Sequence, residues 1–492
     1  MNNAFAAYPA AFVYDEPDNK EIDHLLWGDF LRFLGPEQEE WAQVRVRGKT
    51  GWMRKDEVQE RRPLEVNFVD IGQGDGCFIV TPEDKFILVD AGERDNMVRF
   101  LRWRFNMKNY PEDRIVPIQY AVISHPDADH YRGFEPLLED ARFRFDTVFH
   151  NGIVERGGDN PLGPKQKINK RTYLTDVIED RASLEGITGD PDKVRDKRYP
   201  NLLKTAVEGG RVGDIRMLCA ADGFLPGYGE EEELVIRVLG PVPEEDPEGE
   251  RLLRWFNDPG KTKNGHSVIL KLEYGRVKIM LGGDLNTPAE EYLLEHYTGL
   301  DPRKLKESSQ DEQELIDKAR ETFEADVAKA CHHGSADFTD LYLRAVNPIA
   351  TVVSSGDNEP HAHPRPDALG AFGKSGRGGR PLIFSTELAR SVTETNARSQ
   401  AIRDKITKLS VLIEKTEDED IRAVLEAEIK KLQEERLERA VTVYGMINLR
   451  TDGERVLLAQ KLERLGSRGK EWDIHLLEPG PDGSLQHKSS ER

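Results

Sequence analysis

The sequence predicts an α/β protein built from stacked layers, and three observations carry this prediction. From residue 64, the runs LEVNFVDIG and KFILVDAG are nearly continuous apolar segments, as expected of strands buried on both faces. The amphipathic segment NMVRFLRWRFNMKNY then precedes a third apolar run, VPIQYAVIS, so strand, helix and strand alternate. Finally, several strands end in histidine and aspartate. In layered α/β sheets, ligands bind at such carboxyl ends.

Composition limits the possible classes of function. The chain has 492 residues, and its 90 acidic and 70 basic side chains give a net charge of -20, which excludes a generic polyanion binder. A phosphate-bearing substrate therefore needs a local basic patch. The three cysteines are too few and too scattered for a disulfide framework, and no run of about 18 apolar residues appears. We expect a cytoplasmic protein without a membrane span.

Residues 1–62 predict a unit of their own. Short β-prone runs rich in Val, Phe and Trp are separated by Gly and Pro, which favours a small β-barrel. The stretch EEWAQVRVRGKTGWM resembles a bacterial SH3-like domain. The resemblance implies peptide binding or packing on a neighbouring domain, whereas Trp41 and Trp52 also fit a plain hydrophobic core. We do not expect the main function to reside here.

The clearest chemical signal follows the third apolar run, in AVISHPDADHYRG. Its side chains combine imidazole and carboxylate, the ligand types that zinc and related metals prefer, and a tight turn could aim them at one point. They are His125, Asp127, Asp129 and His130. An ordinary acidic turn is the alternative, because PDAD is also favourable turn sequence.

Further candidate ligands lie at the ends of later strands. VKIMLGGDLN carries Asp284, DVAKACHHGSADF carries His332 and His333, and IATVVSSGDNEPHAHP carries His361 and His363. Six of the 12 histidines thus fall at predicted strand ends. This clustering favours a metal site at one edge of a sheet over an ordinary turn.

The ordered motifs FVDIGQGDG, ILVDAG, ISHPDADHYRG, LGGDL, HHGS and GDNEPHAHP resemble the metallo-β-lactamase fold, and within it the hydrolase domain of the ComEC competence proteins and their soluble relatives. We expect this domain over residues 63–385. The resemblance implies an αββα sandwich with two divalent metal ions at one edge, most often zinc. Asp127 stands where the usual H-x-H-x-D-H signature has a histidine, and an oxygen ligand there keeps manganese possible.

The resemblance also implies how the first ligands divide between the metals. His125 and Asp127 would hold one ion, Asp129 and His130 the other, and Asp284 would bridge both. Asp129 is in addition an expected catalytic carboxylate.

The remaining histidines receive roles from the same resemblance. His333 and His363 would complete the ligand set, with His266 from the NGHS turn as a competitor for the position of His363. His332 would donate a hydrogen bond to the substrate or leaving group, and an indirect or swapped ligand role is its alternative. Asp90 would organise the histidine loop without binding metal.

This set of residues predicts a hydrolytic mechanism. Two metal ions roughly 3.5–4 Å apart lower the pKa of a bridging water to near neutrality and present it as hydroxide. Phosphorus is the favoured electrophile, because the ComEC-like branch implies phosphodiester or nucleic-acid hydrolysis. A Gly-rich basic segment, FGKSGRGGRP, supplies candidates for phosphate contact, namely Lys374, Arg377 and Arg380. Another basic segment, KQKINKR at 165–171, is interpreted as a solvated loop.

The sequence therefore predicts a dinuclear phosphodiesterase, first of all a nuclease, with nucleic acid or another phosphodiester as its partner. Two alternatives stay open. One is an esterase of small phosphate compounds of the phosphorylcholine or nucleotide type, and the other is a metal-stabilised scaffold without catalysis. The complete set of candidate ligands argues against the scaffold.

Three further segments complete the predicted organisation. Residues 151–235 exceed what the bare fold requires and predict an insertion, or lid, over the edge of the site. Residues 386–440 repeat apolar residues every three or four positions among Glu, Lys and Arg, which predicts a helical hairpin or short coiled coil. This hairpin could serve a homodimer, a protein partner or packing on the body. Residues 441–492 predict a β-hairpin and a frayed tail.

Overall fold

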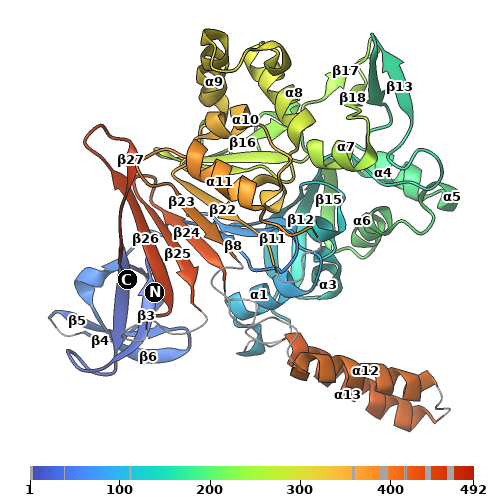
Figure 1. Cartoon of the computed structure of the whole chain (residues 1–492). Helices are drawn as coiled ribbons and strands as arrows, with labels where there is room; N and C mark the ends of the chain where they lie inside the picture. Colours follow the sequence, from blue (N-terminus) through green and yellow to red (C-terminus); the bar gives the residue numbers. More distant parts are fainter. Residues whose placement is uncertain are drawn as a thin grey trace.

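The computed structural model describes residues 4–37, 39–109, 113–356, 361–386, 397–414, 416, 418–437, 445–462 and 470–491. At its centre two β-sheets face each other, and helices cover the outer face of each sheet (Figure 1). The layers therefore follow the order helix, sheet, sheet, helix, which confirms the predicted fold class.

The first sheet has the strand order β15-β12-β11-β10-β9-β8-β24-β25-β26-β27. Its strands are β8 (Leu64–Phe68), β9 (Gly76–Val80), β10 (Phe86–Ala91), β11 (Val116–Ile123), β12 (Phe143–His150), β15 (Val212–Met217), β24 (Ile447–Thr451), β25 (Val456–Lys461), β26 (Trp472–Pro479) and β27 (Leu485–Glu491). All residues of β8 and β9 are buried, in accord with their continuous apolar sequence.

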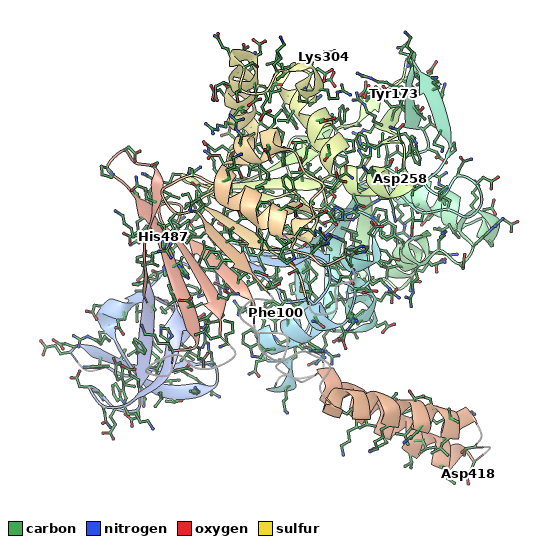
Figure 2. The ribbon with its side chains drawn as sticks, in the orientation of Figure 1. Phe100, Tyr173, Asp258, Lys304, Asp418 and His487 are labelled. Atoms are coloured by element: carbon green, nitrogen blue, oxygen red, sulfur yellow. The ribbon has the colours of Figure 1, made fainter. Side chains whose placement is uncertain are left out.

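The outer face of the first sheet is covered by α1 (Asn96–Arg104), α3 (Phe134–Glu139), α4 (Arg181–Thr188) and α6 (Arg198–Glu208). The amphipathic segment predicted before β11 forms α1, whose Phe100 lies in the core between helix and sheet (Figure 2). Burial of one apolar stripe per helix thus holds this layer in place.

The second sheet has the strand order β16-β19-β20-β21-β22-β23. These strands are β16 (Leu234–Gly240), β19 (Ile269–Tyr274), β20 (Val277–Leu281), β21 (Val327–Lys329), β22 (Ala350–Val353) and β23 (Leu382–Ser385). On its outer side lie α8 (Thr287–Thr298), α9 (Gln310–Phe323), α10 (Asp340–Val346) and α11 (Pro366–Ser375).

Parallel pairing determines where the candidate ligands meet. In the first sheet β10, β11, β12 and β15 are parallel neighbours, and in the second sheet β20, β21, β22 and β23 are parallel neighbours. The loops after β11, β20, β21 and β22 therefore leave at carboxyl ends of the two sheets. These loops carry the histidines and aspartates that the sequence singles out.

Residues before β8 form a strand-rich unit with the order β3-β2-β6-β5-β4-β1-β7. Its strands are β1 (Ala4–Ala6), β2 (Ala10–Tyr14), β3 (Glu21–Leu26), β4 (Phe30–Glu37), β5 (Trp41–Val46), β6 (Lys49–Arg54) and β7 (Val58–Gln59). Trp41 is buried and Trp52 is half-buried, whereas the SH3-like identity of this unit stays a prediction. Arg450 of β24 donates to the carbonyl of Leu26 and to Asp29, and so ties the unit to the first sheet.

The predicted insertion, residues 151–235, contains helices and two strands of a small separate sheet, whose other two strands lie beyond residue 235. This sheet has the order β13-β14-β18-β17, with β13 (Lys165–Ile168), β14 (Arg171–Leu174), β17 (Glu244–Glu245) and β18 (Arg251–Arg254). The segment KQKINKR is thus a β-hairpin and not the expected loop, although its lysines are exposed. Shorter elements are α2 (Ala128–Tyr131), α5 (Pro191–Val194), α7 (Pro259–Gly265), and the 3-10 turns η1 (Lys55–Glu57), η2 (Met107–Asn109), η3 (Ala220–Asp222), η4 (Pro302–Lys304) and η5 (Cys331–Gly334).

Two helices, α12 (Ala397–Glu414) and α13 (Glu419–Leu437), form a hairpin that projects from the body, and Asp418 marks its turn (Figures 1 and 2). The strands β24 and β25 after it form the predicted β-hairpin. The final residues do not fray as expected, because β27 pairs with β26. Among the described residues, no helix combines the length and the apolar character that crossing a membrane requires.

Candidate metal centre

Four loops deliver the candidate ligands to one edge of the sandwich. Ser124 and His125 follow β11 directly, and α2 continues this loop through Asp129 and His130. Asp284 follows β20, and the 3-10 turn η5 after β21 holds His332 and His333. Both histidines adopt positive φ angles, 49° and 54°, a conformation uncommon outside glycine. Such backbone conformations cost free energy and persist only where the surrounding structure holds them. They are frequent at functional sites.

The Oδ2 atom of Asp284 lies at the centre of these loops. The Nε2 atoms of His333 and His130 are 3.2 Å and 3.3 Å from it. The Nε2 atoms of His332 and His125 follow at 3.9 Å and 4.0 Å. Four imidazoles from two different sheets therefore surround one carboxylate oxygen. In addition, Asp129 places Oδ2 3.4 Å from Nε2 of His333.

The other ring nitrogens of three buried histidines are fixed by neighbouring groups. We call His125, His130 and His333 the inner histidines. Nδ1 of His130 lies 2.8 Å from Asp90, Nδ1 of His125 lies 3.0 Å from the Ser124 hydroxyl, and Nδ1 of His333 lies 3.1 Å from the Ser354 carbonyl oxygen.

The Nε2 atoms of the inner histidines are buried and have no hydrogen-bond partner among the described residues. Buried polar atoms are ordinarily satisfied, and metal-binding histidines use their second nitrogen in this way to fix the ring. The inner histidines therefore fit a metal ion. Two groups of side chains bring their donor atoms together: within each group, these atoms lie within 4.8 Å of one another. The groups are His125-His130-Asp284 and Asp129-His130-His333. His130 belongs to both groups, so the groups form one connected cluster.

Charge at the centre favours ionised carboxylates. Burial alone would raise the pKa of Asp127, but the hydrogen bond and charge of His125 outweigh it and hold this pKa at about 2. Burial and the neighbouring histidines compete in the same way at Asp129 and Asp284, and the pKa of each carboxyl lies below its ordinary value. Carboxylates that are ionised at neutral pH are suitable ligands for divalent cations.

Asp90 lies where the sequence predicts it, behind the histidine loop. One of its oxygens accepts from the backbone N–H of Ser124 and the other from the Ser124 hydroxyl, both at 2.7 Å. Asp90 therefore fixes the start of the loop as well as the ring of His130. Its role as an organising carboxylate that does not bind metal stays a prediction.

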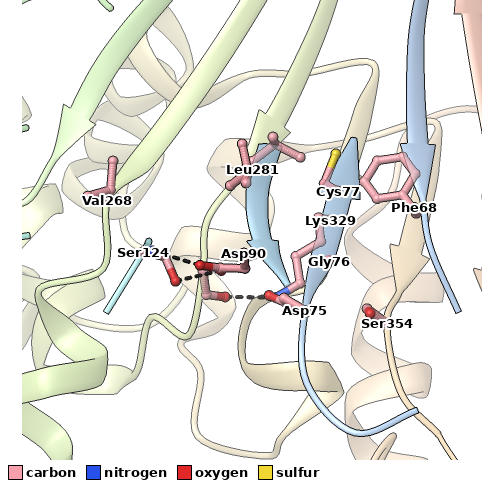
Figure 3. Close-up of a pocket in the computed structure, with 12 residues that line it drawn as sticks. Phe68, Asp75, Gly76, Cys77, Asp90, Ser124, Val268, Leu281, Lys329 and Ser354 are labelled. Atoms are coloured by element: carbon pink, nitrogen blue, oxygen red, sulfur yellow. Dashed lines mark hydrogen bonds and ion pairs between the residues drawn. The ribbon is translucent and has the colours of Figure 1, made fainter. Parts of the chain in front are cut away.

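Sequence reasoning missed a buried ion pair behind the centre. Lys329, the last residue of β21, forms an ion pair with Asp75, and Figure 3 shows the two side chains facing each other. Nζ of Lys329 also donates to the Gly283 carbonyl at 2.9 Å and lies 3.7 Å from Oδ1 of Asp284. The available signal was a charged residue at the end of the otherwise apolar strand VAK, three residues before His332. Asp75 itself belongs to the first Gly-rich turn.

A second missed lysine stands at the front of the centre. Lys263 of α7 forms an ion pair with Oδ1 of Asp127, while Oδ2 of Asp127 lies 3.6 Å from Nε2 of His125. With its amide nitrogen turned toward the loop, the next residue, Asn264, donates to the same Oδ2 at 2.8 Å. Helix α7 therefore fixes the carboxylate that replaces the signature histidine.

The two competing histidines occupy different surroundings. The ring of His363 lies 5.5 Å from that of His332 and 6.3 Å from that of His333, at the rim of the centre. His266 is buried away from it, stacked on Phe256, with Nε2 2.7 Å from the carbonyl oxygen of Arg254. In place of His266, the next residue faces the centre, because the Ser267 hydroxyl lies 3.3 Å from Nδ1 of His125.

The three cations expected to contact phosphate do not gather with the histidines. Arg377 forms an ion pair with Asp326, just before the amino end of β21, and donates to the carbonyls of Ala325 and Asn347. Helix α11 starts near the histidine rim and ends at Ser375, with Lys374 in its last turn, and Arg380 precedes the amino end of β23. All three therefore lie toward the opposite edge of the parallel strands. The Gly-rich, basic composition of this segment does not indicate toward which edge of the sheet α11 runs.

Comparison with known proteins agrees with the observed fold and edge site. Residues 76–333 match the family described as the metallo-beta-lactamase superfamily. The chain is also similar to the ComE operon protein 3 of Bacillus subtilis (strain 168), with 22% identity over 320 residues, which is 62% of this chain and 30% of that protein. The chain thus spans less than a third of this relative's length. The family match covers more than half of the chain, from the first Gly-rich turn to the histidine pair, and the chain belongs to the metallo-β-lactamase superfamily.

Proposed function

We propose that the protein is a metal-dependent phosphodiesterase with two divalent ions, and that nucleic acid is its first candidate substrate. The observation that carries this proposal is the convergence of four imidazole Nε2 atoms on Oδ2 of Asp284, with the second nitrogen of the inner histidines fixed. A scaffold has no need of this many buried and unsatisfied donor atoms, because each costs free energy in the absence of a ligand.

The positions suggest how the ligands divide between two ions. Asp129, His130 and His333 would hold one ion, and His125 with Asp127 would hold the other, while Asp284 would serve both. His332 lies close enough to Asp284 to join the second set, and His363 at the rim is the further candidate. The mixture of imidazole and carboxylate suits zinc, and the carboxylate share keeps manganese possible.

The chain's own residues orient and bind around this pair of ions. When bound, two divalent ions supply an activated water and polarise the phosphoryl group. Asp90 and Ser124 fix the inner histidines, and the ion pair of Lys329 and Asp75 supports Asp284 from behind. His332 is about a quarter exposed, so its ring is placed to donate a hydrogen bond to the leaving oxygen.

The choice of a phosphodiester rests on two observations. The ComEC-like motifs imply this substrate class, and the cation Lys263 lies beside the metal centre, next to Asp127. A small-molecule phosphoesterase would use the same metal centre and would differ only in the residues that surround the centre and contact the substrate. The experiment must therefore offer both polymers and small esters.

The test compares wild type with Asp284→Asn, which keeps the size of the side chain and removes its charge. Elemental analysis should find about two metal ions per wild-type chain and fewer in the variant. We expect hydrolysis of bis-p-nitrophenyl phosphate and of labelled single- or double-stranded DNA or RNA, and a loss of at least about 100-fold in kcat/KM for Asp284→Asn, since even indirect partners of metal ligands cost 10–100-fold.

A matched control and two outcomes make the test decisive. Asp367→Asn removes an exposed aspartate of α11 and should change neither metal content nor rate. Bound metal with turnover of small phosphate esters alone would replace the nuclease by the small-molecule esterase. A folded wild-type protein without metal and without turnover would contradict the proposed function.

A further inference from the structure

The side chain of Lys263, in α7, lies beside the metal centre and contacts Asp127. Its Nζ forms an ion pair with Oδ1 of Asp127 and lies 3.4 Å from Oε1 of Glu155. The side chains of Lys263 and Asp127 are 16% and 27% exposed, whereas the inner histidines are almost completely buried. Lys263 and Asp127 are therefore partly open to solvent beside the buried ligands.

Two carboxylates hold the ammonium group and leave it one donor. An ammonium carries three N–H donors. Asp127 and Glu155 take two of them, and no third partner of this ammonium group is found within the described ranges. Asp127 belongs to the loop after β11, and Glu155 belongs to the segment after β12. The ammonium group of Lys263 is therefore anchored from two sides. The remaining donor therefore has a defined position beside the centre.

Two other cations are held by other partners. Lys329 is buried behind Asp284, with Asp75 and the Gly283 carbonyl as its partners. Arg377, which the sequence favours, is engaged with Asp326 toward the opposite edge of the sheet. A phosphodiester carries a negative charge on its non-bridging oxygens, and a positioned charged donor is the usual way in which proteins meet it.

We propose that Lys263 donates to a non-bridging phosphoryl oxygen of the substrate, with Asp127 and Glu155 holding its ammonium group in place. This inference rests on the proposed phosphodiesterase function and names the cation that gives the site its preference for phosphate. It makes Lys263 a substrate-binding residue and α7 the element that positions it.

The experiment measures phosphate binding apart from turnover. Metal-loaded wild type, Lys263→Met and Lys263→Arg are titrated with inorganic phosphate by calorimetry, and their metal content is measured by elemental analysis. Lys263→Met should raise the Kd for phosphate and the KM for bis-p-nitrophenyl phosphate by about tenfold or more, the usual effect of losing a hydrogen bond from a charged donor. Metal content should stay at the wild-type value, and Lys263→Arg should retain part of the affinity.

The control removes the same charge from the same helix. Lys261 is half exposed, and its Nζ lies 3.8 Å from Asp337, on the side away from Asp127. Lys261→Met should bind phosphate as wild type does. Lys263→Gln, which keeps an N–H donor for Asp127, replaces Lys263→Met if the latter does not fold.

Each outcome decides the inference. An unchanged phosphate Kd in Lys263→Met overturns it. Fewer bound metal ions with an unchanged phosphate Kd per loaded site also overturns it, because Lys263 then only positions Asp127. If wild type binds phosphate through Lys263 but hydrolyses no phosphodiester, the inference stands and the proposed function fails. If wild type hydrolyses phosphodiesters and Lys263→Met does so equally well, the inference alone fails.

Discussion

At the scale of single residues, Glu290 is an acid that the fold keeps protonated. It lies in α8, fully buried, and accepts a hydrogen bond from the backbone N–H of Thr339 at 2.5 Å. Its Oε1 atom has no hydrogen-bond partner within the described part of the chain. Burial raises the pKa of Glu290 from 4.5 to about 8. At neutral pH the folded protein therefore holds a proton that the unfolded chain releases.

This difference has a defined sign. Below pH 4.5 the carboxyl of Glu290 is protonated in both states and does not affect stability. As the pH rises toward about 8, the unfolded chain ionises while the folded protein does not, so the free energy of unfolding falls. Glu290→Gln removes this effect and should raise the free energy of unfolding by roughly 1–3 kcal/mol at neutral pH, with little change in mild acid.

Urea denaturation at the two pH values measures the effect. Glu314→Gln on α9, where the side chain is more than half exposed, should change stability at neither pH. An equal gain for Glu290→Gln at both pH values would show that its carboxyl is not held protonated by the fold.

Single residues also show what the sequence could predict about the site. His125, His130 and Asp284 were predictable, because histidines and aspartates directly after apolar strands have few other uses. Lys329 and Asp75 were not, because the two partners of this buried pair lie far apart in the chain, and only the fold brings Asp75 close to Asp284 and His333. Pairing across the sandwich depends on tertiary structure, which sequence spacing does not reveal.

At the scale of elements, the Gly-rich turn between β8 and β9 packs against the loop that carries Asp129 and His130. Gly74 has φ +102°, and a Cβ atom placed on it would lie 1.7 Å from the carbonyl oxygen of Asp129. The next residue, Asp75, donates its backbone N–H to that same carbonyl at 3.3 Å. The Ser354 hydroxyl donates to the Gly74 carbonyl at 2.9 Å. The turn therefore contacts loops from both sheets of the sandwich.

Gly74→Ala should displace α2 and weaken metal binding. The added methyl group cannot fit beside Asp129, and alanine rarely adopts this φ. We expect the affinity for metal to fall by about 10-fold or more, as for other groups that position metal ligands. Competition with a chelator measures the change. Gly249→Ala, at φ +86° with open space around it, imposes similar strain without the contact and should retain wild-type affinity.

The elements differ in how far their sequence predicted them. Buried strands such as β8, β9 and β11 were clear, because their residues are apolar without interruption. The hairpin of β13 and β14 was missed, because a lysine-rich segment is typical of solvated loops and the hairpin is stabilised by the pairing of β14 with β18. The positions of Lys374 and Arg380 were missed for another reason. The direction of α11 decides which edge of the sheet they approach, and composition contains no information about direction.

At the scale of the whole molecule, the helical hairpin is an excursion that begins and ends at one place. A Cβ atom on Gly445 would lie 1.9 Å from the carbonyl oxygen of Thr386, so the two points where the described chain leaves and rejoins the body are in contact. Within the hairpin, Ile402 and Leu432 are buried, and both helices pack on each other. The body is therefore continuous without it.

Replacing residues 387–444 by a short Gly/Ser linker should leave the body intact. We expect metal content, kcat/KM and the midpoint of thermal unfolding close to those of wild type, because the sandwich core lies elsewhere. Light scattering of the same variant tests the predicted role in association. A loss of metal or activity in the variant monomer would show that the hairpin supports the site.

The pairing of β8 with β24 has a consequence for how the protein is made. Val66 is paired with Leu449, so β8 waits for a partner strand that is synthesised only after all the strands of the second sheet. Until then β8 presents an unpaired, apolar edge, which is the kind of surface that recruits chaperones or neighbouring nascent chains. The last strands cover this edge and, through Arg450, also hold the N-terminal unit. Strands β24 to β27 thus close a structure whose candidate metal ligands are all synthesised before them.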